Sequence, residues 1–220
     1  MLKKCFIATL AVALFANVAS DALSQVVQFR LETTDMSGTP VDTVTVGDDF
    51  MLKTYTQHVG GYSSPDFAGV FAAYLDIMYD DAMTSVVGDV DFAELYSTVT
   101  SGDLSTPGMM DNIGGLGVIF PTLEPLGIDE KLVFSVPMRA EAEGIASFVG
   151  ADAESDIQHP VLVYGSNAAV PAKDVDFGAI NTRLAFDSTV LSVVPEPSSS
   201  VALLLGLFGI AHSQRRRAHG

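Results

Sequence analysis

The chain has 220 residues, 48% of them apolar, and a formal net charge of −16. This length predicts one domain with flanking segments, or two small domains. Between residues 21 and 194, 26 acidic residues stand against six basic ones. The balance excludes nucleic acid and anionic membrane surfaces as partners, because no basic patch is available to neutralise phosphates.

Residues 1–24 have the three-part pattern of a secretory signal peptide. Lys3 and Lys4 precede an apolar run over residues 5–16, and small residues follow it. Cleavage is expected after Ser20 or Ser24, so the general secretion machinery and signal peptidase are expected partners. The only cysteine, Cys5, would be removed, which excludes disulfides and thiol chemistry from the mature protein.

Residues 25–193 are predicted to form one all-β domain. Alternation places Val27, Phe29, Leu31 and Thr33 on one face of a half-buried strand. Further strands are expected over 41–46, 50–59, 70–79, 132–139, 144–149, 161–164 and 183–193, with a loop over 60–66. Residues 92–99 suit a strand or a helical turn, and residues 101–121 read as a long Gly-rich connection. Short strands punctuated by Gly, Pro and Asp are typical of an antiparallel β-sandwich.

Residues 194–220 form a tail of three parts. Pro195, Glu196 and Pro197 hold an extended backbone, because proline is poorly accommodated in a following helix. Residues 198–214 carry no charge and span about 26 Å as a helix, at ~1.5 Å per residue. Arg215, Arg216 and Arg217 would hold the end of this transmembrane helix in the cytoplasm. An ordinary proline-rich linker before a single-pass anchor is the alternative interpretation.

Tripeptide, apolar helix and basic end together resemble the PEP-CTERM sorting signal of exopolysaccharide-producing Gram-negative bacteria. His212, Ser213 and Gln214 separate the helix from the arginines slightly more than is usual in that family. The resemblance implies that an exosortase-type membrane peptidase cleaves near the tripeptide. It further implies transient anchoring in the inner membrane, followed by transfer to the cell envelope or the extracellular matrix.

The order of the predicted strands resembles the cohesin-like jelly roll that cellulosomal cohesins share with some carbohydrate-binding modules. The resemblance is carried by residues 44–57, 69–88 and 130–150. Residues 101–128 form an insertion that is not typical of cohesins. This insertion makes the use of the dockerin-binding face uncertain for this chain.

The sequence contains no catalytic motif, and we predict that the protein is not an enzyme. His58 and His159 are far apart in the sequence and are interpreted as structural or surface residues. The acidic pairs at 48–49, 80–81 and 89–91 are interpreted as turn caps. Calcium binding is the alternative for these acids, although the twelve-residue calcium loop is missing; no other cofactor or metal is predicted.

Two functional hypotheses remain, and exposed side chains discriminate between them. The first is a noncatalytic envelope or matrix protein whose sandwich contacts another protein. The alternative is a carbohydrate-binding module for an exopolysaccharide, with Tyr62 and Tyr96 as sugar contacts in a chain that has no Trp. A row of exposed tyrosines would favour the sugar, whereas a flat apolar face without one would favour a protein partner.

Overall fold

The computed structural model describes residues 27–60, 65–117, 126–153, 161–163, 173–174 and 184–196. The expected signal peptide and most of the tail, including Pro197 and the three arginines, lie outside these ranges, as do Tyr62 and His159. Within the described ranges, no helix is both long and apolar enough to cross a bilayer.

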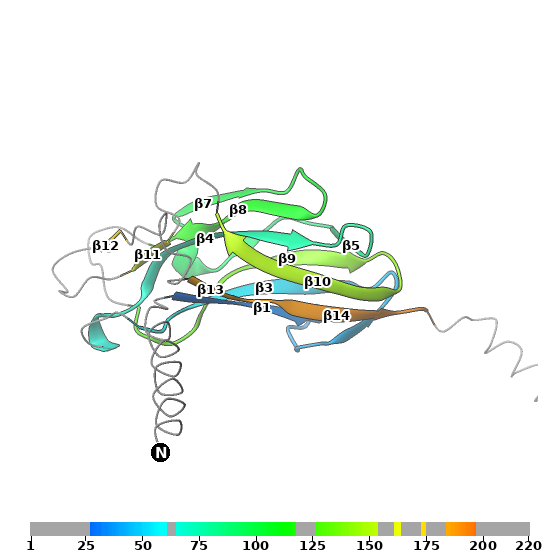
Figure 1. Ribbon diagram of the computed structural model, residues 1–220, viewed down its shortest axis with the longest axis horizontal. Coiled ribbons are helices and arrows are strands. Elements are labelled where there is room, and N and C mark those ends of the chain that lie inside the picture. The colour runs from blue at the N-terminus through cyan, green and yellow to red at the C-terminus, as the bar shows by residue number, and fades with distance from the viewer. Residues whose placement is uncertain are drawn as a thin grey trace, which may run out of the picture.

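Two sheets pack face to face, and they confirm the predicted all-β sandwich (Figure 1). The first, sheet A, has the order β13 (Leu184–Asp187), β1 (Val27–Thr34), β3 (Asp49–His58), β9 (Lys131–Ala140) and β5 (Thr84–Val86), and β6 (Asp91–Phe92) also pairs with β9. The second, sheet B, has the order β12 (Lys173–Asp174), β11 (Val161–Val163), β4 (Val70–Tyr79), β10 (Gly144–Asp152), β14 (Thr189–Val194) and β2 (Thr43–Thr45).

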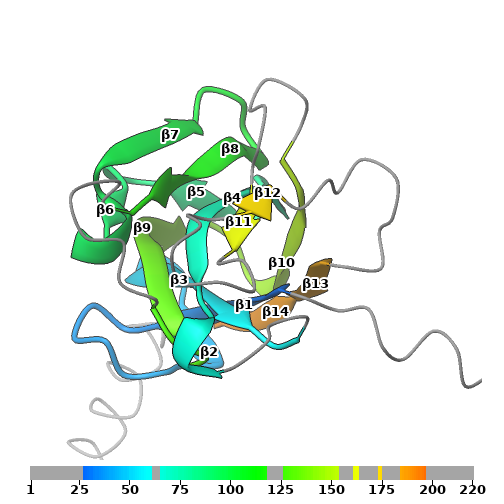
Figure 2. The ribbon, with the colours of Figure 1, turned by 90° about the vertical axis from the view of Figure 1, so that its left-hand side faces the viewer.

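A hairpin of β7 (Val99–Asp103) and β8 (Met109–Leu116) extends sheet B. β11 and β10 pair with successive parts of one edge of β4, and β8 pairs with the opposite edge. In two perpendicular views the hairpin lies on the side of the molecule opposite β1 and β14 (Figures 1 and 2). The prediction of a long connection over 101–121 is therefore wrong for residues 101–116. Two short 3-10 helices complete the described elements, η1 (Pro65–Phe67) and η2 (Glu94–Tyr96).

Adjacent glycines explain why the hairpin is hard to recognise from sequence. A side chain on Gly114 would collide with the carbonyl oxygen of Ala73, and one on Gly115 with that of Tyr96. Glycine is needed here because backbones approach too closely for a Cβ. A Gly-Gly pair that usually signals a loop thus permits close packing of β8 on β4 and η2.

The sheets are not antiparallel throughout, which corrects the prediction. β13 runs parallel to β1, and β14 runs parallel to β2. The expected single strand over 183–193 divides at Ser188, so that β13 belongs to sheet A and β14 to sheet B. Residues 184–194 therefore pair within both sheets and connect them along one side of the sandwich.

The core lies between the sheets and follows the alternation of the sequence. Phe29 stacks on Phe186 with ring centroids 5.4 Å apart, and Phe50 meets Phe148 edge-on at 6.1 Å. The first pair joins β1 to β13, whereas the second joins β3 of sheet A to β10 of sheet B. These rings belong to a largely aliphatic core, and burial of such apolar surface is the dominant favourable term in folding.

Candidate functional site

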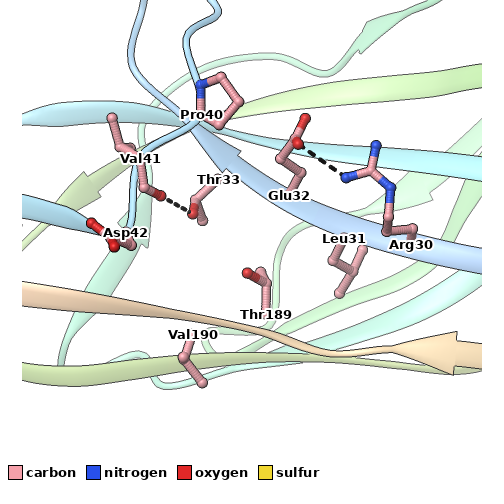
Figure 3. A pocket seen from close by; sticks show the side chains of 9 residues that line it. All are labelled: Arg30, Leu31, Glu32, Thr33, Pro40, Val41, Asp42, Thr189 and Val190. Carbon is pink, nitrogen blue, oxygen red and sulfur yellow. Dashed lines mark hydrogen bonds and ion pairs between the residues drawn. The ribbon is translucent and has the colours of Figure 1, made fainter.

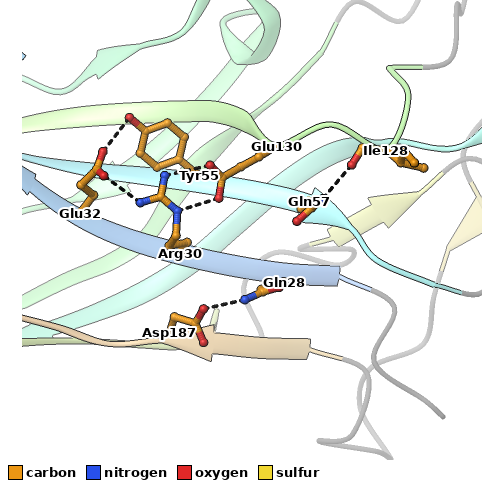
Figure 4. A network of polar contacts seen from close by, with 8 residues as sticks. All are labelled: Gln28, Arg30, Glu32, Tyr55, Gln57, Ile128, Glu130 and Asp187. Atoms are coloured by element: carbon orange, nitrogen blue, oxygen red, sulfur yellow. Dashed lines mark hydrogen bonds and ion pairs between the residues drawn. The ribbon is translucent and has the colours of Figure 1, made fainter. Parts of the chain in front are cut away.

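The outer face of sheet A carries a network of polar side chains (Figure 4). The Arg30 guanidinium donates to both carboxylate oxygens of Glu130, at 2.7 and 2.8 Å, and to Glu32 at 3.0 Å. It also lies over the Tyr55 ring, 4.2 Å from the centroid, and the Tyr55 hydroxyl donates to Glu32 at 3.1 Å. These contacts, the bond to Glu130 foremost, raise the pKa of Arg30, so the group stays charged.

Two further bonds extend the network along the same face. The Gln28 amide donates to Asp187 at 2.5 Å, and the Gln57 amide donates to the Ile128 carbonyl oxygen at 3.0 Å. Since the Tyr55 ring is covered by Arg30, the face offers no open aromatic platform there. We interpret it as a solvated face with satisfied polar groups.

A shallow groove of about 450 Å³ lies between β1 and β14 (Figure 3). The groove exists because the last strand divides: β13 pairs with β1 only over Val27–Arg30, which leaves the rest of that edge of β1 without a partner strand from this segment. Beyond that point Thr33 bonds Val41 through both its hydroxyl and its carbonyl oxygen, which closes one end of the groove. The lining residues are Arg30, Leu31, Glu32, Thr33, Pro40, Val41, Asp42, Thr189 and Val190.

The outer face of sheet B is different, because large apolar side chains are exposed on it. Ile145 is 73% exposed, Val190 59% and Met78 47%. Each alternates with a core residue of its own strand, which places it on the outside of the sandwich. We define the apolar band as the exposed residues Met78, Ile145, Val149, Val190 and Val194 together with the half-buried Met109.

Strand register makes this band continuous. Met78 lies opposite Met109 on one side and Val149 on the other. Ile145 lies opposite Ser192, and therefore diagonal to Val190 and Val194. Val194 also borders a hollow of about 380 Å³, which is lined by Met36, Val41 and Val44 and by Asp35, Asp48 and Asp49. Eight large apolar side chains are exposed in the described ranges, and five of them belong to the band.

The two sheets differ in charge. Among the described residues, the strands of sheet A carry four basic residues and four acidic ones: Arg30, Lys53, Lys131 and Arg139, and Glu32, Asp49, Asp91 and Asp187. The strands of sheet B carry Asp76, Asp103, Asp111, Asp152 and Asp174 but only one basic residue, Lys173 in β12. Four more exposed acids adjoin strands of the band in the sequence: Asp80 and Asp81 directly after β4, and Glu141 and Glu143 in the turn before β10. The Glu141 carboxylate accepts from the hydroxyl of Ser85 in β5 of sheet A.

One of the two predicted sugar contacts, Tyr96, lies in the core. Tyr96 is fully buried, and its hydroxyl donates to the Val70 carbonyl oxygen at 2.9 Å. The prediction is wrong for this residue, because a ring without exposed surface cannot stack on a ligand. Tyr74 also has only 6% of its surface exposed, and its hydroxyl donates to the Val99 carbonyl oxygen. Tyr62 lies outside the described residues.

The acidic turns act as caps, as predicted for two of the pairs. Asp48 accepts from the backbone N–H of Thr45, and Asp80 accepts from that of Ala82. Asp49 instead pairs with Arg139, which lowers the pKa of Asp49. In the parts of the chain that the structure describes, no group of three or more His, Cys, Asp or Glu residues is placed to hold a metal ion.

His58 has the structural role that was predicted for it. It is buried at the end of β3, and its Nδ1 accepts from the backbone N–H of Gly69 at 3.0 Å. Burial lowers its pKa, so the neutral imidazole is the form that the fold holds.

Comparison with known proteins adds a description of the fold. No protein-family model and no curated protein matches the chain. Among solved structures, the chain is similar to a type II cohesin module of a scaffoldin from Acetivibrio cellulolyticus (10% identity, 82% of this chain and 97% of that one, TM-score 0.47). It is also similar to a cohesin in complex with a dockerin from the same organism (9%, 76% and 99%, 0.46). A third is a non-cellulosomal cohesin from Archaeoglobus fulgidus (10%, 80% and 96%, 0.43). These similarities concern the sandwich fold alone.

Proposed function

We propose that this protein is a noncatalytic module of the cell envelope or extracellular matrix that binds a protein partner through the apolar band. The observation that supports the proposal is the exposure of aliphatic side chains over four neighbouring strands, β8, β4, β10 and β14. Contiguous apolar surface on a folded domain marks an interaction site, because leaving it in water costs free energy.

The chemistry of the band favours a protein over a polysaccharide. Its members are Met, Val and Ile, and no exposed aromatic ring lies among them. Sugars are generally bound by planar rings, whereas protein partners pack aliphatic and methionine side chains. Among the residues that the structure describes, no row of exposed tyrosines supports the carbohydrate-binding alternative.

Charge specifies the partner further. The four strands of the band carry Asp76, Asp111 and Asp152 but no basic residue, and the exposed Asp80, Asp81 and Glu143 lie next to these strands in the sequence. We therefore expect a partner surface with an aliphatic centre and a rim of Lys and Arg. A second copy of this chain would bring acids against acids, and an anionic membrane would be repelled in the same way.

The tail completes the proposal. We infer that the chain is exported by its first 24 residues and anchored by residues 198–214. An exosortase-type peptidase then cleaves it near Pro195, Glu196 and Pro197. Support comes from the sequence pattern of both ends, and from the position of Pro195 directly after the last strand.

Paired variants test the docking face. The processed protein would be immobilised and exposed to the envelope fraction of a host that makes exopolysaccharide, beside Ile145→Asp and Val190→Asp. Lys53→Gln on sheet A is the matched control, because it also lowers the net charge by one and lies outside the band. We expect a basic protein that binds wild type and control, is lost from both band variants, and dissociates as salt is raised.

Other outcomes would contradict the docking proposal. They are retention of the partner by both band variants, retardation of the protein by purified exopolysaccharide alone, or a dimer that Ile145→Asp dissociates. Processing is tested separately by intact mass and cell fractionation, beside a variant with alanine at residues 195–197. A mature mass without the tail in wild type only is expected, and an uncut tail in both would indicate a plain membrane anchor.

A further inference from the structure

The C-terminal end of β14, the last described strand, is hydrogen-bonded on both of its edges. β14 pairs antiparallel with β10 over Thr189–Val193 and parallel with β2 over Ser192–Val194. The carbonyl oxygen of Val194 accepts from the backbone N–H of Val46 at 2.9 Å. Leu191 and Val193 are buried in the core, with 0% and 3% of their surfaces exposed.

The tripeptide starts at the next residue, without a spacer. Pro195 has no N–H and therefore cannot continue the hydrogen-bonded ladder. The carboxylate of Glu196 lies beside the turn at Gly47, where an added Cβ would be 3.4 Å from Glu196 Oε1. Pairing with the sandwich thus extends to Val194 and stops there.

We propose that the pairing of β14 sets the N-terminal limit for removal of the tail. The cut falls on the C-terminal side of Val194, and the mature protein keeps every strand that the structure describes. Hydrolysis of that peptide bond consumes one water, leaving a carboxylate on the sandwich and an amine on the tail. This inference rests on the proposed processing for its biological setting, but the limit applies to any peptidase.

The physical reason is the accessibility of the backbone. A peptidase binds its substrate as an extended segment with free backbone groups, and both edges of β14 are occupied at Ser192 and Val193. Cleavage before Val194 would require the strand to leave two neighbours and to expose Leu191 and Val193 to water. Proteolysis of paired strands follows the population of such open states, which is small for core strands.

Limited digestion of the purified full-length chain tests this limit. A broad-specificity protease is added, and the resistant core is identified by intact mass. We expect a C-terminus at Val194 or up to three residues beyond it. Val46→Pro removes the N–H that bonds Val194, and its core should end before Val194. Val46→Ala keeps that N–H and serves as the matched control, with the same end as wild type.

Three results would overturn the inference. They are a folded wild-type core that ends before Val194, a folded Val46→Pro protein trimmed like wild type, and unprotected backbone amides over 191–194 in hydrogen exchange. The first and third measurements use wild type only, so they decide even if Val46→Pro fails to fold. Because the protease is added, an uncut tail in cells would contradict the exosortase proposal without touching this result.

Discussion

The ring of Phe50 in β3 packs edge-on against the ring of Phe148 in β10, with the centroids 6.1 Å apart. This contact joins the two sheets, and both side chains are fully buried. Packing between the sheets therefore depends on residues almost one hundred positions apart in the sequence. The same strand, β10, carries Ile145 and Val149 of the apolar band on its outer face.

Phe148→Ala should lower the free energy of unfolding by about 3–5 kcal/mol, through lost burial and the cavity left behind. The measurement is denaturant unfolding of the mature domain. Ser147→Ala, one residue away on the exposed face, is the control and should change stability by less than about 0.5 kcal/mol. A loss below about 1 kcal/mol for Phe148→Ala would show that the two sheets do not depend on this contact.

Gly114→Ala should destabilise the β7–β8 hairpin, because the new Cβ would collide with the carbonyl oxygen of Ala73. Forcing atoms into such a contact typically costs about 1–3 kcal/mol. Hydrogen exchange of the β8 amides and thermal unfolding both measure the effect. Ser101→Ala, in the exposed strand β7, is the control, and equal stability of the two variants would argue against close packing of β8 on β4.

Stability should depend on pH through His58. Its pKa is lowered in the folded state by burial, whereas the unfolded chain keeps a pKa of about 6.5. Below about 6.5 the unfolded state binds the extra proton first, so stability is full above this pH and falls toward the lowered folded pKa. His58→Asn keeps an acceptor for the Gly69 N–H and should flatten the dependence between about pH 5 and 7.5.

Unfolding free energies of both proteins across that pH range would check this prediction. Asp49→Asn provides a comparison, since the pKa of Asp49 is lowered by Arg139 and its effect belongs to more acidic solutions. An unchanged profile in His58→Asn would assign the dependence to other groups.

Arg30 and Glu130 should be coupled weakly in spite of their two short hydrogen bonds. Both side chains are about one-third exposed, and such pairs contribute about 0.2–1 kcal/mol. A double-mutant cycle of Arg30→Met and Glu130→Gln measures the coupling, which should shrink as salt is raised. A coupling above about 2 kcal/mol that ignores salt would mean that the network on sheet A is more than a solvated face.

Alternation in the sequence predicted several strands closely, but it did not predict their neighbours. The expected strand over 70–79 is β4, and β1, β3, β9 and β10 lie close to their expected positions. The pairing of the last two strands could not be predicted from the sequence. β13 and β14 belong to different sheets, and each runs parallel to a strand that is distant in the sequence. Parallel pairing depends on contacts between residues far apart in the sequence, and the local alternation of apolar and polar residues does not specify those contacts.

The sequence by itself determined the β class, the turn-capping acids Asp48 and Asp80, and the structural role of His58. These follow from side-chain period and from hydrogen bonds between near neighbours. Only the tertiary structure decided that Tyr96 is buried, that Gly114 lies inside a hairpin, and that the apolar band stays exposed. The reason is that period two assigns residues to the two faces of a strand, whereas the packing of distant elements decides which face is covered.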